Sequence, residues 1–297
     1  MRYQEKHIGS RFAARFLELA VYDDEDVSEL KTLSPEKNVM TEVEFLPYLK
    51  YFTSIENLIL LPGEMPEDPA RHLAGLQNVV RLGIEYDNRD ADDEYRLDLS
   101  AFRNVEYIAS KSSWNFRNAG AATALKYLQV QYWCEDDLES LAGTNIDTLS
   151  ISGGRLCTLE VSEQIPLKVL SLSYLRRLES LSGVEALPLK MLELDHCSKI
   201  SDFDLLREST VEYLLLYGGN RLNDIGFISD MRCLRRAMLD VFVSNGDLSP
   251  LDSLEKAVIL TDKKNFNRKN SDLPKTVEEY SVSGIPSWRF LFGDRRL

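Results

Sequence analysis

An aspartate, a histidine and a cysteine adjoin at one place in this sequence, Asp195-His196-Cys197. Side chains of these three types suit a zinc ion. Neighbouring residues of a strand, however, point to opposite faces, so Asp195 and His196 cannot easily converge with Cys197 on one ion. We interpret the triplet as a core cysteine beside a surface histidine. We therefore expect no metal site and no cofactor.

Motifs for catalysis give no better lead. The three histidines, His7, His72 and His196, lie far apart in the chain. The sequence contains no glycine-rich phosphate loop, no nucleophile elbow and no paired-histidine motif. Carboxylates are plentiful, but tuning their pKa values for catalysis requires a closed pocket. We expect a protein that is not an enzyme.

Two polar connections are candidates for binding. The stretch 85–95 is rich in aspartate, and its acidic spacing suggests a calcium loop, but it lacks the glycine and the terminal glutamate of an EF-hand. We favour a solvated acidic loop. The connection 111–117 contains two aromatic residues. One of them, Trp114, is either a binding residue or a cap on the acidic loop.

The residues that must position these side chains follow a repeated six-residue phrase: apolar, two variable residues, apolar, one variable residue, apolar. Successive phrases begin 20 to 26 residues apart. Self-similarity at a near-fixed period indicates a stack of similar small units. The eleven phrases begin at Ile55, Val79, Val105, Leu125, Ile146, Leu167, Leu189, Val211, Leu234, Leu254 and Val277.

Each phrase predicts a short strand. Its fourth and sixth residues are two apart, which is the strand period, so both point to one face. Units of this length stack their strands in parallel. Second apolar segments, such as 137–141 and 177–181, return the chain to the next strand. Little room is left for an α-helix, so we expect 3₁₀ turns and extended segments on the convex side.

The phrases and their return segments resemble the leucine-rich repeat family, in the short-repeat bacterial class typified by internalins. The resemblance covers about residues 55–282. It implies a leucine-rich repeat solenoid with a curved parallel β-sheet on its concave face. The family places an asparagine ladder after the strands. Here those positions hold Trp133, Gly154, Leu175, Cys197 and Gly219, so the turns must satisfy their backbone groups by other means.

Three regions are expected along the chain. Residues 1–54 form an N-terminal cap with degenerate repeats, whose register the pattern does not assign. Residues 55–286 hold about eleven repeats. Residues 287–297 form a C-terminal cap that covers the last repeat with aromatic side chains.

The composition limits the partners. The net charge is −13 and the isoelectric point is near 4.9, so the surface repels phosphate backbones and anionic lipids and attracts basic proteins. One basic cluster, residues 263–269, is interpreted as a solvated loop. No stretch reaches the roughly 18 apolar residues that span a bilayer. The four scattered cysteines indicate a reducing compartment. Charges interrupt residues 1–20, so we expect no signal peptide and a cytoplasmic location.

The concave face consists of the variable positions of the strands. Tyrosines at matching positions in neighbouring strands are expected to stack into a patch, and aromatic residues and arginine are enriched at interface cores. The residues predicted to bind a partner are Arg81, Glu85, Tyr107, Lys111, Trp114, Tyr127, Gln129, Gln131, Tyr132, Glu193, Asp195, Tyr213, Tyr217 and Asp240.

The sequence therefore predicts a non-enzymatic scaffold that binds a basic protein through its concave face and adjoining loops. Neither nucleic acid nor a membrane is an expected partner. A narrower hypothesis, based on charge, is an inhibitor or immunity-type protein that masks a toxin or an enzyme. The alternatives are a phosphatase regulator, a secreted effector, and a carbohydrate-binding or catalytic solenoid that uses the tyrosine, glutamine and serine side chains of the trough.

Overall fold

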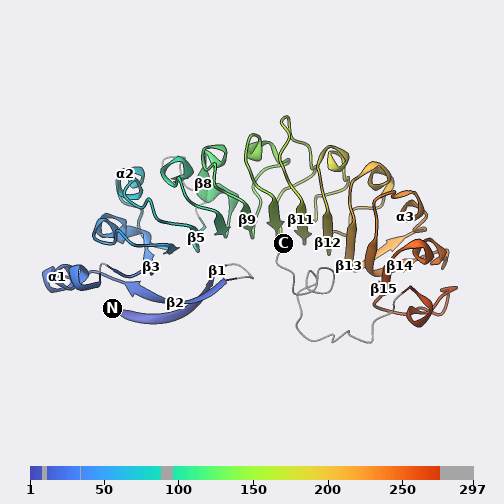
Figure 1. Ribbon diagram of the computed structural model, residues 1–297, viewed down its shortest axis with the longest axis horizontal. Helices are drawn as coiled ribbons and strands as arrows, with labels where there is room; N and C mark the ends of the chain where they lie inside the picture. The colour runs from blue at the N-terminus through green and yellow to red at the C-terminus, as the bar shows by residue number, and fades with distance from the viewer. Residues whose placement is uncertain (9–11, 34, 88–95, 275–297) are drawn as a thin grey trace. The chain divides into compact units, whose positions relative to one another are not determined.

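The computed structural model describes residues 1–8, 12–33, 35–87 and 96–274. The chain divides into two compact units, and each is described by itself. Unit 1 comprises Met1–Gly154 and Val161–Pro166, and unit 2 comprises Arg155–Glu160 and the chain from Leu167 onward. In both units, short strands lie side by side, and 3₁₀ turns or short helices form the return segments (Figure 1).

Unit 1 contains one long run of strands. β1 and β2 pair antiparallel. From β2 onward, neighbours pair in parallel in the order β2-β3-β4-β5-β7-β9-β10. A separate parallel pair, β6 with β8, lies on the return segments. The strands are β1 (Arg2–Ile8), β2 (Phe12–Leu19), β3 (Asn38–Glu42), β4 (Asn57–Leu61), β5 (Arg81–Ile84), β6 (Leu97–Asp98), β7 (Tyr107–Ser110), β8 (Phe116–Arg117), β9 (Tyr127–Val130) and β10 (Thr148–Ile151).

The return segments of unit 1 are short. Its two α-helices are α1 (Asp24–Leu33) and α2 (Pro69–Leu73) within the described part of the unit. The 3₁₀ helices are η1 (Val43–Tyr51), η3 (Leu99–Ala101), η4 (Ser113–Asn115), η5 (Ala119–Ala121) and η6 (Glu139–Leu141).

Unit 2 has the same construction. Its strands pair in parallel in the order β11-β12-β13-β14-β15. They are β11 (Val169–Ser173), β12 (Met191–Asp195), β13 (Tyr213–Leu222), β14 (Arg236–Val243) and β15 (Lys256–Ile259). The return segments are η7 (Val184–Ala186), η8 (Asp204–Glu208), α3 (Phe227–Asp230), η9 (Ser249–Ser253) and η10 (Asn270–Asp272).

The register of the strands follows the phrases. In each of the ten phrases up to residue 259, the strand begins at the third phrase residue. The fourth and sixth residues form the core: Leu128 pairs in register with Leu149, and Val130 pairs with Ile151, all fully buried. Burying one such side chain contributes about 1.5–3 kcal/mol. The predicted fold class, a leucine-rich repeat solenoid with 3₁₀ return segments, is confirmed. The eleventh phrase and the expected C-terminal cap lie outside the described residues.

Side chains at two places satisfy the backbone of the turns. Before the strands, Asn104 donates from Nδ2 to the Gln77 carbonyl at 2.7 Å, and Asn78 makes the same bond one repeat earlier. After the strands, the Cys197 thiol donates to the Leu172 carbonyl at 3.5 Å. Of these residues, Cys197 stands where the family has a ladder asparagine, and its thiol satisfies a backbone carbonyl there.

We call the face formed by the third and fifth phrase residues, opposite the leucine core, the variable face. In unit 1 the β1–β2 hairpin covers the start of this face. Ile8 and Phe16 pack with Met40 and Ile59 into a buried cluster, and Tyr107 packs against it. The sequence did not predict this hairpin. The start of the variable face is therefore closed, because the apolar side chains of β3 and β4 are covered from within the chain.

The N-terminal strands continue the repeat. Leu17 of β2 pairs in register with Val39 of β3, which pairs in register with Leu58 of β4. The structure thus supplies the register that the pattern left unassigned. Among the described residues, no helix is both long enough and apolar enough to cross a membrane.

Candidate functional site

Two tyrosines stack on the variable face of unit 1. Tyr107 and Tyr127 are the first residues of β7 and β9 and pair in register. Their ring centroids lie 4.3 Å apart with an interplanar angle of 6°. Both side chains are half-buried. The stacking expected of tyrosines at matching positions is present, because parallel strands in register place them one strand spacing apart.

The residues at the same position in the preceding strands, at the start of β4 and β5, are polar. Asn57 donates from Nδ2 to Asn38 Oδ1 at 2.6 Å, and Arg81 donates from Nη1 to Asn57 Oδ1 at 3.3 Å. Arg81 pairs in register with Tyr107. The guanidinium is therefore held in place beside the tyrosine stack.

Other predicted residues of unit 1 follow these strands. Lys111 Nζ lies 3.7 Å from Glu85 Oε2, with both side chains about two-fifths exposed. An ion pair so exposed contributes little to stability. Gln129 lies on β9 two residues after Tyr127, so it shares the face of the stack. Gln131 is exposed and Tyr132 is half-buried beyond the strand end.

Trp114 lies apart from the stacked tyrosines in the fold. It belongs to η4, on the return segment, and the Arg96 guanidinium lies 4.5 Å from the centroid of its ring. Arg96 also donates to the Phe116 carbonyl, from Nη2 at 2.6 Å. Both interpretations of Trp114, as a binding residue and as a cap on the acidic loop, stay predictions. Most of that loop, residues 88–95, lies outside the described residues.

Unit 2 brings together the remaining predicted residues on β12, β13 and β14. Ser171 donates to Glu193 Oε2 at 2.9 Å, and the Arg236 guanidinium lies 5.6 Å from the centroid of the Tyr213 ring. Asp195 pairs in register with Tyr217. Thr261 donates to Asp240 Oδ1 at 3.3 Å.

The variable face of unit 2 is largely apolar. Met191, Leu215, Met238 and Val258 form a buried cluster against which the two tyrosines, Tyr213 and Tyr217, pack. The Tyr217 hydroxyl also donates to Met238 Sδ at 2.9 Å. These two tyrosines therefore have a packing role as well as partial exposure. This apolar face was not foreseen, although its residues alternate with the core leucines in the sequence.

The Asp195-His196-Cys197 triplet divides between the surface and the core. His196 Nδ1 lies 2.6 Å from Asp195 Oδ1, and the imidazole is half exposed. Cys197 is fully buried. In the part of the chain that the structure describes, no three histidine, cysteine, aspartate or glutamate side chains gather around a possible metal position.

The four cysteines are unpaired, and they differ in exposure. Burial raises the pKa of the Cys197 thiol from 9.0 to about 11. In the unfolded chain this thiol ionises near its ordinary pKa, so the folded state keeps its proton over a wider range of pH. Its contribution to stability is complete below about pH 9 and is lost as the pH rises toward 11.

Labelling tests this assignment. Iodoacetamide at pH 8 is expected to modify the exposed Cys233 in the native protein and to leave Cys197 unmodified, because the thiolate is the reactive form. Peptide mass spectrometry after quenching measures the modified fraction at each cysteine. Labelling in denaturant is the control, in which both thiols react. Native labelling of Cys197 at the rate of Cys233 contradicts the assignment.

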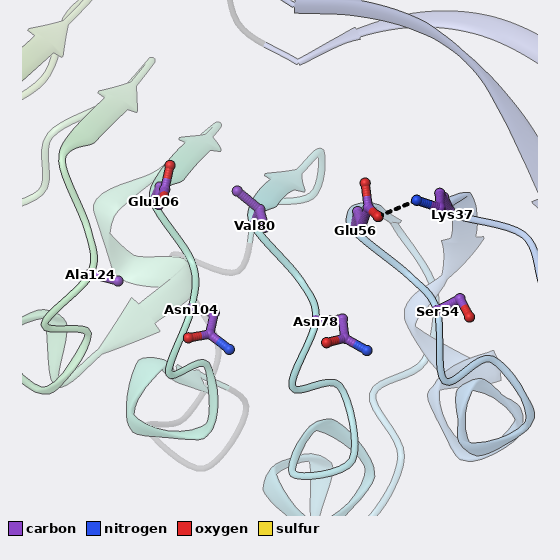
Figure 2. Close-up of a pocket in the computed structure, with 8 residues that line it drawn as sticks. All are labelled: Lys37, Ser54, Glu56, Asn78, Val80, Asn104, Glu106 and Ala124. Carbon is purple, nitrogen blue, oxygen red and sulfur yellow. Dashed lines mark hydrogen bonds and ion pairs between the residues drawn. The ribbon is translucent and has the colours of Figure 1, made fainter.

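A polar pocket of about 570 Å³ lies where the chain enters the strands of unit 1 (Figure 2). Its side chains are used within the repeats: Lys37 Nζ pairs with Glu56 Oε1 at 2.5 Å, and Asn78 and Asn104 donate to backbone carbonyls. This arrangement holds adjacent repeats together. The pocket is lined by Lys37, Ser54, Glu56, Asn78, Val80, Asn104, Glu106 and Ala124.

Sequence reasoning missed one exposed residue beside the predicted ones. Tyr174, directly after β11, has 53% of its surface exposed, and its ring stacks on that of His196 at 4.7 Å between centroids. The signal was available: Tyr174 and His196 each stand two residues after the last core leucine of their repeat.

Parallel strands in register, a core of phrase leucines and 3₁₀ return segments define a protein of the leucine-rich repeat fold. An internalin from Listeria monocytogenes is a similar solved structure, with 17% sequence identity and a TM-score of 0.44 over 80% of this chain and 70% of that chain. No protein-family model matches the sequence, and no curated protein matches it at a significant level.

Proposed function

We propose that this protein is a non-enzymatic interaction module that binds a basic protein. The observation that carries the proposal is the stacked pair of Tyr107 and Tyr127, half-buried on the variable face of unit 1 beside Arg81. Stacked tyrosines offer a large contact area and lose little side-chain freedom on binding, and tyrosine and arginine are the residues enriched among binding hot spots.

The charge of the chain indicates the class of partner. A net charge of −13 attracts basic proteins and speeds their encounter. In unit 2, Glu193, Asp195 and Asp240 add carboxylates beside Tyr213 and Tyr217. We propose these residues as a second binding surface, which lies on unit 2. The finer hypothesis is that binding masks the partner, as an inhibitor or immunity-type protein does, in the cytoplasm.

Affinity capture with matched variants tests the proposal. Basic proteins captured from a lysate of the source cells are identified, and their Kd is measured for the wild type and for the double variant Tyr107→Ala/Tyr127→Ala. The double variant is expected to bind about 10- to 30-fold more weakly, as loss of a hot spot predicts. Tyr22→Ala is the control, because Tyr22 is 85% exposed and remote from the stack in sequence.

Salt dependence provides the second measurement. The association rate is expected to fall steeply as ionic strength rises from about 20 to 300 mM, because opposite charges steer the encounter. Circular dichroism confirms that each variant is folded. Unchanged affinity of the double variant, or a captured saccharide whose binding ignores salt, overturns the proposal.

A further inference from the structure

Three neighbouring strands of unit 2 are apolar on both faces. In β13, β14 and β15 the fourth to sixth phrase residues are all apolar, at 214–216, 237–239 and 257–259. In β11 and β12 the middle one of these residues is polar, at Ser171 and Glu193. A continuous apolar run is typical of strands in a sheet that is covered on both sides.

The exposure of these side chains also indicates a covering segment. Leu215, Met238 and Val258, the fifth phrase residues of β13, β14 and β15, are at most 3% exposed. At the same position of β11 and β12, Ser171 and Glu193 are half-buried. All the described side chains in the apolar cluster come from β11 to β15 themselves. Neighbouring strands shield a side chain only from the sides, so excluding water from above takes a further layer.

Unit 1 shows how such a face is covered. Met40 and Ile59 lie on the variable face of β3 and β4, and Ile8 and Phe16 of the β1–β2 hairpin pack on them. All four side chains are at most 1% exposed. The covering segment there precedes the first of these strands in the sequence. In unit 2, the segment in the corresponding place is the one that follows β15.

The sequence after β15 contains side chains that suit this role. We call residues 287–297 the aromatic segment; it lies outside the described residues. Within five positions it has four large apolar side chains, and it has three arginines against one aspartate. These residues are Trp288, Phe290, Leu291, Phe292, Arg289, Arg295 and Arg296. The segment is therefore both apolar and basic, in a chain whose net charge is −13.

The charges around the apolar cluster are complementary to it. Glu193 and Asp195 lie on β12, and Asp240 directly follows the core leucine of β14, all half-buried. The basic residues of this face, Arg236 and Lys256, stand at the starts of β14 and β15. A carboxylate accepts several hydrogen bonds, and arginine donates to it in a fork. An occupant that is apolar in the middle and basic toward the carboxyl ends of the strands fits this face.

The described chain ends close enough to reach it. The carbonyl of Pro274, the last described residue, accepts from the Ala257 amide of β15 at 3.2 Å. Trp288 stands fourteen residues after Pro274, and fourteen extended residues span up to about 45 Å. From β15 to β12 there are three strand spacings, about 14 Å. The aromatic segment is therefore long enough to cross the whole cluster.

We propose that the aromatic segment lies across the variable face of unit 2, with its rings on Leu215 and Met238 and its arginines beside the carboxylates. This place differs from the edge of the last repeat, where the cap was expected. Met191 of β12 distinguishes the two, because a cap on the edge of β15 does not reach it. A partner that binds the second surface competes with the segment, and this consequence alone rests on the proposed function.

Photo-cross-linking in the full chain tests the location. Phe290 is replaced by p-benzoylphenylalanine, which keeps an aromatic ring and reacts with neighbouring side chains under light. Peptide mass spectrometry is expected to find links from position 290 to Met191 or Met238 of the same chain. Links confined to residues 256–274, at the edge of the last repeat, overturn the inference. Links between ¹⁵N-labelled and unlabelled copies also overturn it, because a second copy is then the occupant.

Methionine oxidation gives an independent measurement. Hydrogen peroxide converts accessible methionines to the sulfoxide, and mass spectrometry follows each site. In Trp288→Ser/Phe290→Ser/Phe292→Ser, the oxidation of Met191 and Met238 is expected to be about 5-fold faster than in the wild type. Unchanged rates at both methionines overturn the inference.

Two controls accompany the oxidation. Met40, which the hairpin of unit 1 buries, is expected to keep its rate in the triple variant. Leu205→Ser replaces an exposed apolar side chain of η8, a return segment, and is expected to leave Met191 and Met238 protected. If Met40 is oxidised as fast as Met238, the triple variant is unfolded and the cross-link decides.

The inference and the proposed function fail separately. If position 290 links to Met238 while Tyr107→Ala/Tyr127→Ala leaves the affinity for the partner unchanged, this inference stands and the proposed function fails. If that double variant loses the partner while position 290 links only to the edge of β15, the proposed function stands and this inference fails.

Discussion

Replacing Trp133 with alanine is expected to lower the free energy of unfolding by about 3 to 5 kcal/mol. Trp133 is the largest fully buried side chain among the described residues. Its indole Nε1 donates to the Asp137 carbonyl at 2.8 Å, and its amide donates to the Gly153 carbonyl at 2.9 Å. Alanine keeps the hydrogen bond from the backbone amide to the Gly153 carbonyl. It leaves a cavity and removes the indole N–H that donates to the Asp137 carbonyl.

Trp114→Ala is the matched control for this prediction. Trp114 is partly exposed, and the Arg96 guanidinium lies 4.5 Å from the centroid of its ring. A cation–π contact at such a site contributes about 0.5–1 kcal/mol. Urea unfolding followed by circular dichroism measures both variants, and hydrogen exchange shows whether the loss is centred on residues 127–154. Equal losses in the two variants contradict the buried role of Trp133.

The strands could be predicted because one constraint determines them. The fourth and sixth phrase residues must reach the same core, so the pattern places β9 and β10 to the residue. The turns are less constrained. Where the family has an asparagine, Trp133 fills the space with its own ring and uses its backbone amide to reach Gly153. Many side chains can satisfy a turn, so the sequence does not say which one will.

The β1–β2 hairpin escaped prediction because its signal is short. Residues 2–8 carry few apolar side chains. Most of the seven residues are exposed in the structure. Gly9, Ser10 and Arg11 separate this segment from the apolar run that follows, and three residues that include a glycine are a usual hairpin spacing. The apolar residues Met40 and Ile59 lie on the variable face, where Ile8 and Phe16 of the hairpin bury their side chains.

The candidate residues were predicted from their places in the phrases. These places predict which side chains pair across strands, but not how side chains in the turns are oriented. The pairing of Tyr107 with Tyr127 follows from equal places in adjacent phrases, and the structure shows the stack. Tyr174 was not among the predicted residues, although the predicted Tyr132 also lies past its strand, where the turn determines how side chains point. The left-handed backbone of Tyr174 is a property of the folded turn and cannot be inferred from the spacing of leucines.

Gly246→Ala is expected to lower the free energy of unfolding by about 2 to 4 kcal/mol, from backbone strain and a steric clash together. Gly246 has φ +70°, and a Cβ there would lie 2.0 Å from the Asn265 carbonyl oxygen. That atom belongs to the backbone of the next turn. The turn cannot simply move away, because the Gly246 carbonyl accepts from the Asn267 amide at 2.9 Å.

Gly75→Ala makes the same chemical change where neither cause applies. A Cβ at Gly75 would meet no atom within 4 Å, and its backbone is outside the left-handed region. Alanine there is expected to be neutral or to stabilise by about 0.4–1 kcal/mol, by restricting the unfolded chain. Urea unfolding of both variants gives the comparison. If Gly246→Ala costs no more than Gly75→Ala, then the turn between β14 and β15 relaxes freely, and its contacts with residues 265–267 do not determine the stacking of these repeats.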